Sequence, residues 1–437
     1  MSDDNERQLI ETYFDRLWPI FRSLTGKGVR DTHDILNELI PLTRVEVPSG
    51  TKCFDWTVPK EWRVNEAYFV GPDKKRRCDI RVNNLHLLNY SAPFKGRVSR
   101  AELDKHLYSL PKQPNAIPYV TSYYRERWGF CLTQKERDSL PDGDYDVVID
   151  TGLFDGSLTL GESILKGESD SEVLISTYTC HPSLANNELS GPLVAAFLYK
   201  RLAAMPNRRL TYRFLFLSET IGSIAYLQRH GEHLKSKVIA GYVVTCAGDR
   251  APFTYKRSRR GDSLADRAAE YVLKRVDGPA TKFRDFWPTG SDERQYCSPG
   301  FNLPIGSVMR SVYGTYPEYH TSLDDRSFIS FDHMKETVEA YFRICNVLEA
   351  NRCYVNLIAN GEPQLGKYGL YPTLGSAEHG VEKQVEAMMW LLNLADGEND
   401  LLSIAERSGY DITLLSTSAE KCVEAGIMTV RDAVVEN

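Results

Sequence analysis

The stretch that decides the fold is STYTCHPSLANNELSG, residues 176–191. It begins as an apolar, β-branched run, reaches His181, crosses a polar turn that contains Asn187, and enters a helical pattern. A strand that leads through a short loop into a helix is the repeating unit of α/β proteins. Because ligands of open α/β sheets bind at the carboxyl ends of the strands, His181 stands where a functional residue is expected.

The sequence on the C-terminal side of this stretch repeats the same alternation of strand and helix. Strands that are apolar throughout are typical of a largely parallel sheet with helices on both faces. We therefore predict an α/β domain with a mixed, mostly parallel sheet. The apolar runs are EVLISTYTC (172–180), TYRFLFLSE (211–219) and VIAGYVVTCAG (238–248), and the amphipathic segments between them are SGPLVAAFLYKRLAAM (190–205) and GSIAYLQRHGEHL (222–234).

Two other regions of the chain have a different texture. Short aromatic and β-branched segments with Pro and Gly punctuation predict a β-rich insertion at 58–150. The α/β domain is therefore predicted to be discontinuous, from 1–57 and 151–355. Residues 365–437 contain a series of short helical patterns that resembles a helix-turn-helix, so we predict a small helical C-terminal domain there.

Composition and charge narrow the class of protein. The 437 residues are 42% hydrophobic and carry a formal net charge of −6, and the predicted C-terminal domain is itself acidic, so nucleic acid is not expected as a partner. The nine cysteines form no CxxC pair and are expected to be reduced thiols. No apolar run approaches the ~20 residues of a membrane span, and the acidic N-terminus does not resemble a signal peptide. These features predict a cytoplasmic protein without membrane contact.

Polar residues follow each predicted strand of the core. His181 follows the first strand, Glu219 the second and Thr245 the third, and two later loops add TGSDERQYCSPG (289–300) and YPEYHTSLDD (316–325). Imidazoles and carboxylates that meet at one sheet edge are the ligands of a metal-activated water. No spacing here is specific by itself, since a lone histidine at a strand end more often makes an ordinary hydrogen bond.

Four motifs carry a resemblance to a known family: HPSLANNELSG (181–191), SETIGS (218–223), SDERQYCSPGFNLP (291–304) and YPEYHTSLDD. They resemble a bacterial aminopeptidase-like family that is related to zinc aminopeptidases and glutaminyl cyclases. The resemblance covers nearly the whole chain, including the β-rich insertion, and it implies a phosphorylase/hydrolase-like α/β core. It also implies that the C-terminal domain is winged-helix-like and that the chain descends from zinc-dependent hydrolases.

Some ligands of the family's metal site have counterparts in this sequence, and others are replaced by neutral residues. His181 matches the first histidine ligand, His320 matches the last, and Glu219 matches one of two paired glutamates, either a ligand or the general base. Asn187 and Thr245, however, stand where the two-zinc enzymes have aspartate ligands. Because a neutral amide oxygen is a poor substitute for carboxylate at Zn²⁺, one zinc ion per chain is expected rather than two.

The leading hypothesis is therefore a zinc-dependent hydrolase of an amide bond in a small molecule or short peptide. His181, His320 and a carboxylate such as Glu219 are expected to hold the metal, with Asn187 as a further candidate ligand, and Glu219 or Glu293 to move the proton. Two alternatives stay open: a deacylase or amidohydrolase acting on a biosynthetic intermediate, and a non-catalytic binding protein. Homo-oligomerisation is possible. The candidate substrate-binding residues are Asp292, Arg294, Tyr124 and Arg310.

Overall fold

A computed structural model of the chain describes residues 3–370 and 379–431. The chain divides into two compact units, one of residues 1–266 and 277–339 and the other of residues 267–276 and 340–437. The parts of the predicted C-terminal domain at 371–378 and 432–437 lie outside the described residues. Among the described residues, no helix has both the length and the apolar character that a membrane crossing requires.

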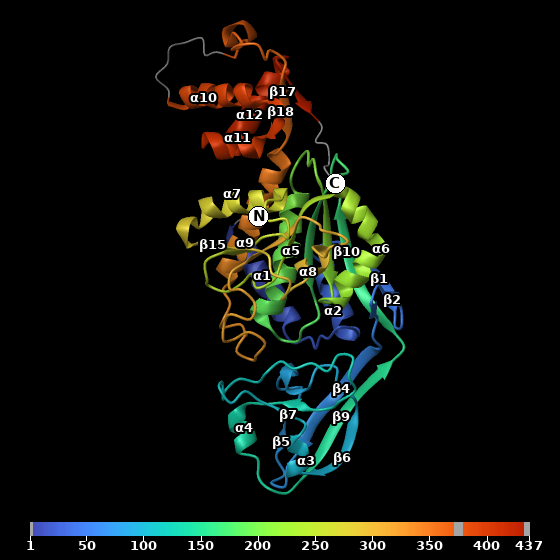
Figure 1. Cartoon of the computed structure of the whole chain (residues 1–437). Helices are drawn as coiled ribbons and strands as arrows, with labels where there is room; N and C mark the ends of the chain where they lie inside the picture. Colours follow the sequence, from blue (N-terminus) through green and yellow to red (C-terminus); the bar gives the residue numbers. More distant parts are fainter. Residues whose placement is uncertain (1–2, 371–378, 432–437) are drawn as a thin grey trace. The chain divides into compact units, whose positions relative to one another are not determined.

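The larger unit is built on one eight-stranded mixed sheet, as the alternating pattern of the sequence predicted (Figure 1). The strands β12, β11, β13 and β16 are parallel, β10 and β1 add an antiparallel edge, and β14 and β15 form the other edge. In spatial order the strands are β1 (Thr43–Pro48), β10 (Ser157–Leu165), β12 (Thr211–Leu217), β11 (Glu172–Tyr178), β13 (Val238–Val243), β16 (Ile305–Met309), β14 (Thr254–Lys256) and β15 (Lys282–Arg284).

The centre of this sheet is buried on both faces. Every residue of β11 and β12 is buried, which explains why both strands read as continuous apolar runs. Helix α5 packs against β11 and β12, and α6 packs against β10. The α-helices of this unit are α1 (Asp3–Leu17), α2 (Lys27–Leu36), α3 (Arg100–Asp104), α4 (Gln134–Asp138), α5 (Ser190–Ala203), α6 (Ile221–Lys237), α8 (Glu293–Tyr296) and the first part of α9 (Phe331–Ala350).

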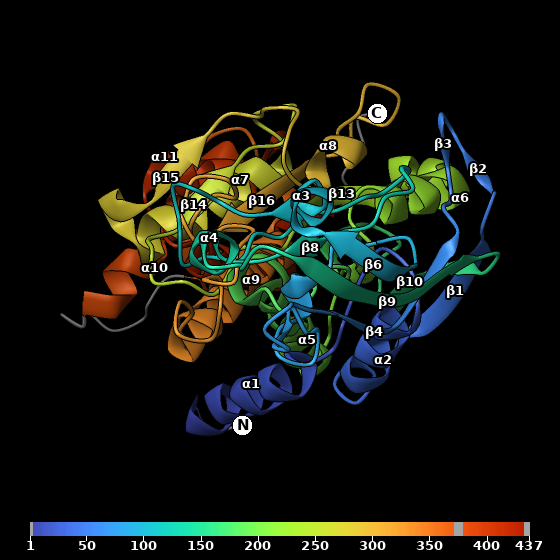
Figure 2. The ribbon, with the colours of Figure 1, turned by 90° about the horizontal axis from the view of Figure 1, so that it is seen from below.

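The predicted β-rich insertion contains a second, four-stranded sheet in the order β5-β4-β9-β6. Burial alternates along β9, so one face of this sheet packs inward and the other faces solvent. A small hairpin of β2 and β3 lies beside α6 (Figure 2). The strands are β2 (Lys52–Cys53), β3 (Trp56–Thr57), β4 (Glu61–Val70), β5 (Arg76–Arg77), β6 (Phe94–Ser99), β7 (Leu107–Tyr108), β8 (Phe130–Cys131) and β9 (Asp144–Phe154).

The smaller unit is a winged-helix domain with a three-stranded sheet in the order β18-β17-β19. Helix α11 begins where the Asp400 side chain accepts a hydrogen bond from the Ser403 amide, and it ends at Gly409 in the left-handed conformation. Asp400 also pairs with Arg267 over two contacts of 2.9 Å. The elements are α7 (Leu264–Val276), the end of α9, β17 (Cys353–Asn356), α10 (His379–Leu394), β18 (Asp396–Asp400), α11 (Leu401–Ser408), α12 (Ile412–Glu424) and β19 (Met428–Arg431).

The start of α5 offers a test of how tightly this core is packed. A Cβ atom added at Gly191 would lie 2.4 Å from the Val244 carbonyl oxygen and 2.5 Å from Thr177 Oγ1. Because a backbone carbonyl cannot move aside, we expect Gly191→Ala to lower the free energy of unfolding by about 2–3 kcal/mol. Gly300→Ala is the control, since nothing lies within 4 Å of that added Cβ. Urea unfolding of both variants measures this, and equal midpoints would contradict the packing.

Candidate functional site

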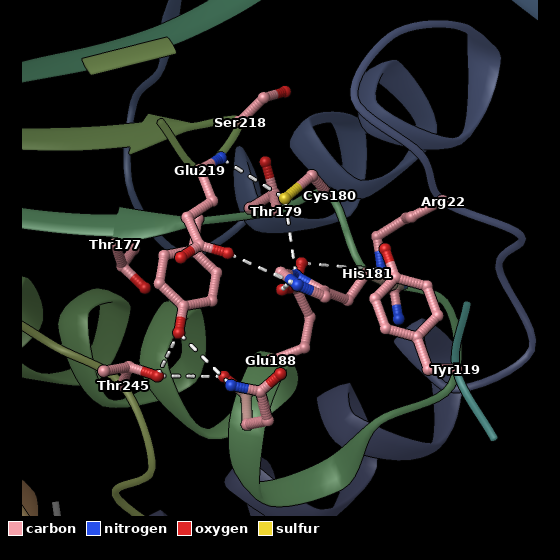
Figure 3. Close-up of polar contacts among 12 residues, drawn as sticks. Arg22, Tyr119, Thr177, Thr179, Cys180, His181, Glu188, Ser218, Glu219 and Thr245 are labelled. Carbon is pink, nitrogen blue, oxygen red and sulfur yellow. Dashed lines mark hydrogen bonds and ion pairs between the residues drawn. The ribbon is translucent and has the colours of Figure 1, made fainter. Parts of the chain in front are cut away.

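The carboxyl ends of the central parallel strands bring the predicted polar residues together. His181 lies three residues after β11, Glu219 two residues after β12, and Thr245 two residues after β13. Figure 3 shows these side chains converging on one space at the sheet edge. The parallel register of β11 with both neighbours is the reason, because parallel strands deliver their following loops to the same edge.

His181 is contacted by a carboxylate at each ring nitrogen. A hydrogen bond of 2.7 Å joins Nδ1 to Glu188 Oε2, and Nε2 lies 3.4 Å from Glu219 Oε2 (Figure 3). Glu188 reaches Nδ1 from a single turn of π-helix, Ala185–Leu189, that precedes α5. Such turns are rare and concentrate at functional sites. Nδ1 is thereby hydrogen-bonded within the protein, while Nε2 points toward Glu219.

The side chain of Arg22 holds His181 and Glu188 in this arrangement. This side chain is fully buried, and it donates from Nε to the His181 carbonyl and from Nη1 to the Leu17 carbonyl, both at 2.8 Å. Its Nε also lies 4.0 Å from Glu188 Oε1. The guanidinium therefore holds the backbone of the histidine loop and supplies positive charge to the carboxylate behind the imidazole.

His320 approaches from the loop after β16. Its Nε2 lies 3.1 Å from Asn187 Oδ1, and its ring centroid is 5.5 Å from that of His181. The other polar atoms of Asn187 are also engaged, because its Nδ2 donates to Tyr178 Oη at 3.3 Å and its carbonyl accepts from Thr245 Oγ1 at 3.0 Å. Asn187 and Thr245 thus form a neutral, hydrogen-bonded wall.

Burial sets the protonation of the site. It lowers the pKa of His181 and of His320 to about 3, so both imidazoles are neutral at physiological pH. Neutral imidazole is the form that binds metals. Burial also raises the pKa of Glu188 to about 8 against the opposing charge of Arg22, and burial together with Asp292 raises the pKa of Glu219 well above its usual range. The Glu219 side chain keeps 23% exposure and so has access to water.

Several loops of the site hold residues in the left-handed backbone region. Thr220, the residue after Glu219, has φ +66 and ψ −73, which is rare for a β-branched residue. Its amide donates to Asp292 Oδ1 at 2.7 Å, and its hydroxyl accepts from Arg294 Nη2 at 2.7 Å. Strained backbone persists where surrounding contacts over-determine it, and it clusters at functional sites. The other non-glycine residues of this kind at the site are Ser183, Cys246 and His320.

The structure thus separates the candidate residues into three groups. His181, Asn187, Glu219 and His320 come together at the sheet edge. Asp292 and Arg294 lie against the Glu219 turn and support its backbone. Asp292 is buried, and burial raises its pKa to about 7.

Three further candidates have contacts away from His181. Glu293 is buried, with Oε1 2.5 Å from Lys256 Nζ and 2.7 Å from Tyr313 Oη. Tyr124 is 51% exposed and donates to the Thr57 carbonyl, and Arg310 is held by α9 and the Ala251 carbonyl. For Tyr124 and Arg310, the expectation of substrate binding came from their residue types alone, and the contacts of both residues lie away from the histidines.

Sequence reasoning gave no role to three residues of the site. Glu188 had a readable signal, because it is a charged residue at the start of an apolar helix, and buried charges need partners. Arg22 and Tyr119 had none, since each reaches the site from a distant segment. The Tyr119 ring centroid lies 5.1 Å from that of His181 and 5.1 Å from that of His320.

The donor atoms at the sheet edge form two pairs with the spacing of zinc ligands. Two ligands of tetrahedral zinc, each at about 2.0–2.1 Å, lie about 3.3 Å apart. The pair of His181 Nε2 and Glu219 Oε2, at 3.4 Å, and the pair of His320 Nε2 and Asn187 Oδ1, at 3.1 Å, have this spacing. Glu188 on Nδ1 is the carboxylate that metal-bound histidines usually carry behind them. A second zinc lacks anionic ligands, because Asn187 and Thr245 are neutral.

The two pairs are not gathered around a single point. Among residues 3–370 and 379–431, the three His, Cys, Asp or Glu residues whose ligand atoms all lie within 4.8 Å of one another are Cys180, His181 and Glu188. In that group, Nδ1 is already bonded to Glu188. The ligand atoms of His181, Glu219 and His320 are therefore not all within 4.8 Å of one another, and one ion can touch both pairs only if the two pairs come closer together.

Comparisons with known proteins identify the family of the chain. A family model described as "Domain of unknown function (DUF4910)" matches residues 11–351, and one described as "winged helix-turn-helix" matches residues 352–430. A Clostridium acetobutylicum protein described as a "putative polysaccharide biosynthesis protein with aminopeptidase-like domain" is 45% identical over 411 residues, which cover 94% of each chain.

Solved structures extend the likeness. That of a "putative peptidase" from Clostridium acetobutylicum has 42% identity and a TM-score of 0.90, and the match covers 98% of each chain. A zinc aminopeptidase from Bacillus subtilis shares the fold at 10% identity, with a TM-score of 0.57 over 78% of this chain and 93% of that one. The expected resemblance to zinc aminopeptidases is therefore confirmed at the level of fold.

The Arg22 anchor generates a stability prediction. Arg22→Met leaves the Glu188 carboxyl without its nearby positive charge and removes the Arg22 donor from the His181 carbonyl, so we expect a loss of about 3–5 kcal/mol in the free energy of unfolding. Arg16→Met is the matched control, because Arg16 pairs with Glu38 on the surface and should contribute less than about 1 kcal/mol. Urea unfolding of the two variants tests this, and similar midpoints would show that Arg22 is dispensable.

Proposed function

The chain belongs to the DUF4910 family, and we propose that it is an aminopeptidase-like hydrolase that cleaves an amide bond with the help of one zinc ion. The observation that carries the proposal is His181, a buried, neutral imidazole with Glu188 on Nδ1 and Glu219 on the side of Nε2. A histidine with a carboxylate behind it and a second, water-accessible carboxylate in front is the arrangement of a hydrolytic metal site.

In this proposal, His181 and His320 hold the ion through Nε2, and the Asn187 amide oxygen is a neutral third donor. When bound, zinc polarises the scissile carbonyl and makes the attacking water more acidic. Glu219 takes the proton of that water on its carboxylate and passes it to the leaving amine. Asp292 and Arg294 keep the Glu219 turn in its strained conformation. The ion pair of Glu293 with Lys256 makes Glu293 the weaker candidate for the base.

The substrate is proposed to be a small molecule or short peptide in a reducing, cytoplasmic compartment, and all nine cysteines are free, as that location requires. A second candidate is deacylation of a saccharide intermediate. One observation favours it: the curated relative is described with polysaccharide biosynthesis. Turnover of N-acyl amino sugars but not of aminoacyl amides would select this alternative.

Metal analysis of purified protein tests the ligand assignment. We expect about one zinc per chain in the wild type, lost in His181→Ala and in His320→Ala, because each variant removes a donor. His233→Ala is the control, since His233 also pairs with a carboxylate, Glu172, but lies outside the site. Two zinc ions per chain would contradict the expectation that neutral Asn187 cannot replace the aspartate ligand of a second ion. No zinc after reconstitution would favour a non-catalytic binding protein.

The role of Glu219 is separable from metal binding. Glu219→Gln keeps the shape of the side chain but cannot accept a proton, so we expect kcat to fall by about 10²–10⁴-fold while zinc is retained. Turnover is measured with aminoacyl amides and N-acyl amino sugars, and zinc by elemental analysis of the same samples. Loss of zinc from Glu219→Gln would instead identify Glu219 as a ligand, and unchanged turnover would remove it from the reaction.

A further inference from the structure

A segment of the insertion runs beside the loop that carries His320. Tyr119 donates its amide proton to the His320 carbonyl at 2.7 Å, which ties the two segments together next to the imidazole. Side-chain and backbone contacts continue along both segments, so the His320 loop is held by the insertion over its length. The other contacts are Gln113 Nε2 to the Pro317 carbonyl at 2.9 Å, Ile117 N to Ser322 Oγ at 3.0 Å, Ser322 N to the Ile117 carbonyl at 2.8 Å, and a bridge between Pro118 and Thr321.

Tyr119 also packs its ring against both histidines, with centroids 5.1 Å from each, while the two imidazole centroids lie 5.5 Å apart. The ring meets His320 edge-on at 88° and His181 at 55°, and Figure 3 shows it next to His181. Its hydroxyl lies 2.8 Å from the Tyr123 hydroxyl, which in turn donates to Asn89 Oδ1 at 3.3 Å. The hydroxyl is therefore anchored within the insertion, while the ring also packs in a cluster that includes Leu184 of the α/β core.

The His320 backbone needs such support. His320 has φ +54, a conformation that costs a non-glycine residue free energy unless its neighbours hold it. Within its own loop, Tyr319 stacks on the imidazole with centroids 3.9 Å apart. A second ring contact, edge-on, and the hydrogen bond to the His320 carbonyl both come from Tyr119.

We propose that the insertion positions the metal centre: residues 113–119 and the His320 loop form one body, and Tyr119 sets the distance of His320 from His181. This inference rests on the proposed function, because it assigns Tyr119 as a positioning residue for a metal ligand. It explains why a β-rich insertion interrupts the α/β domain, since the insertion supplies one wall of the site. If the His320 loop moves to bring the two pairs of donors to one ion, residues 113–119 move with it.

The test compares Tyr119→Ala, Tyr119→Phe and Tyr124→Ala in the full chain. Zinc affinity is measured by competition with a chromophoric chelator, and folding by urea unfolding. We expect Tyr119→Ala to weaken zinc binding by about 10- to 100-fold, the range seen when partners behind metal ligands are removed. Tyr119→Phe keeps the ring and should restore the affinity. Tyr124→Ala is the control, because Tyr124 is exposed in the same loop and does not contact His320.

A second readout keeps this inference separate from the proposed function. Hydrogen–deuterium exchange of residues 317–322 is compared in metal-free protein, where we expect about tenfold faster exchange in Tyr119→Ala and wild-type exchange in Tyr124→Ala. If no variant or wild type binds zinc, the proposed function fails, and faster exchange still supports positioning by Tyr119. Unchanged exchange, or wild-type zinc affinity in folded Tyr119→Ala, overturns the inference.

Discussion

The hydrogen bond between His181 Nδ1 and the buried Glu188 carboxylate is the contact on which the site depends. It settles which ring nitrogen faces the other polar residues, and it requires a π-helical turn at Ala185–Leu189 to bring Glu188 within reach. It also depends on Arg22, whose positive charge lowers the pKa of the Glu188 carboxyl against the effect of burial. Three segments therefore hold one imidazole in place: the first loop of the α/β core, the start of α5 and the N-terminal segment.

Opposite this charged side, the wall of Asn187, Thr245 and Tyr178 is neutral and fully hydrogen-bonded. A pocket with carboxylates on one side and amide and hydroxyl groups on the other suits a single cation. In the proposed function, one cation replaces the hydrogen bond between His320 and Asn187, and a second cation would find no anionic ligand on this wall.

Much of this could be predicted from the sequence, and the parts that could not have a common physical cause. The strands β11 and β12 are apolar in every position but a few, so their burial and the position of His181 and Glu219 followed directly. The motif around His320 identified its loop, but nothing in it shows that residues 113–119 hold that loop in place. Arg22 likewise contacts a carbonyl 159 residues away, and such contacts leave no periodic pattern in the sequence.

The insertion is joined to the core at a point where its two ends already meet. Glu61 pairs with Phe154 at the end of the inserted sheet, and Pro48 pairs with Ser157 at the start of the β1–β10 ladder. Closing a loop of about a hundred residues costs about 2 kcal/mol more than closing one of about a dozen, because each doubling adds about 0.6 kcal/mol. Once β4 and β9 have paired, that cost has already been met, and the remaining connection is the equivalent of a short hairpin turn. If β4 and β9 pair early in folding, their pairing brings β1 and β10, at the edge of the central sheet, close to each other.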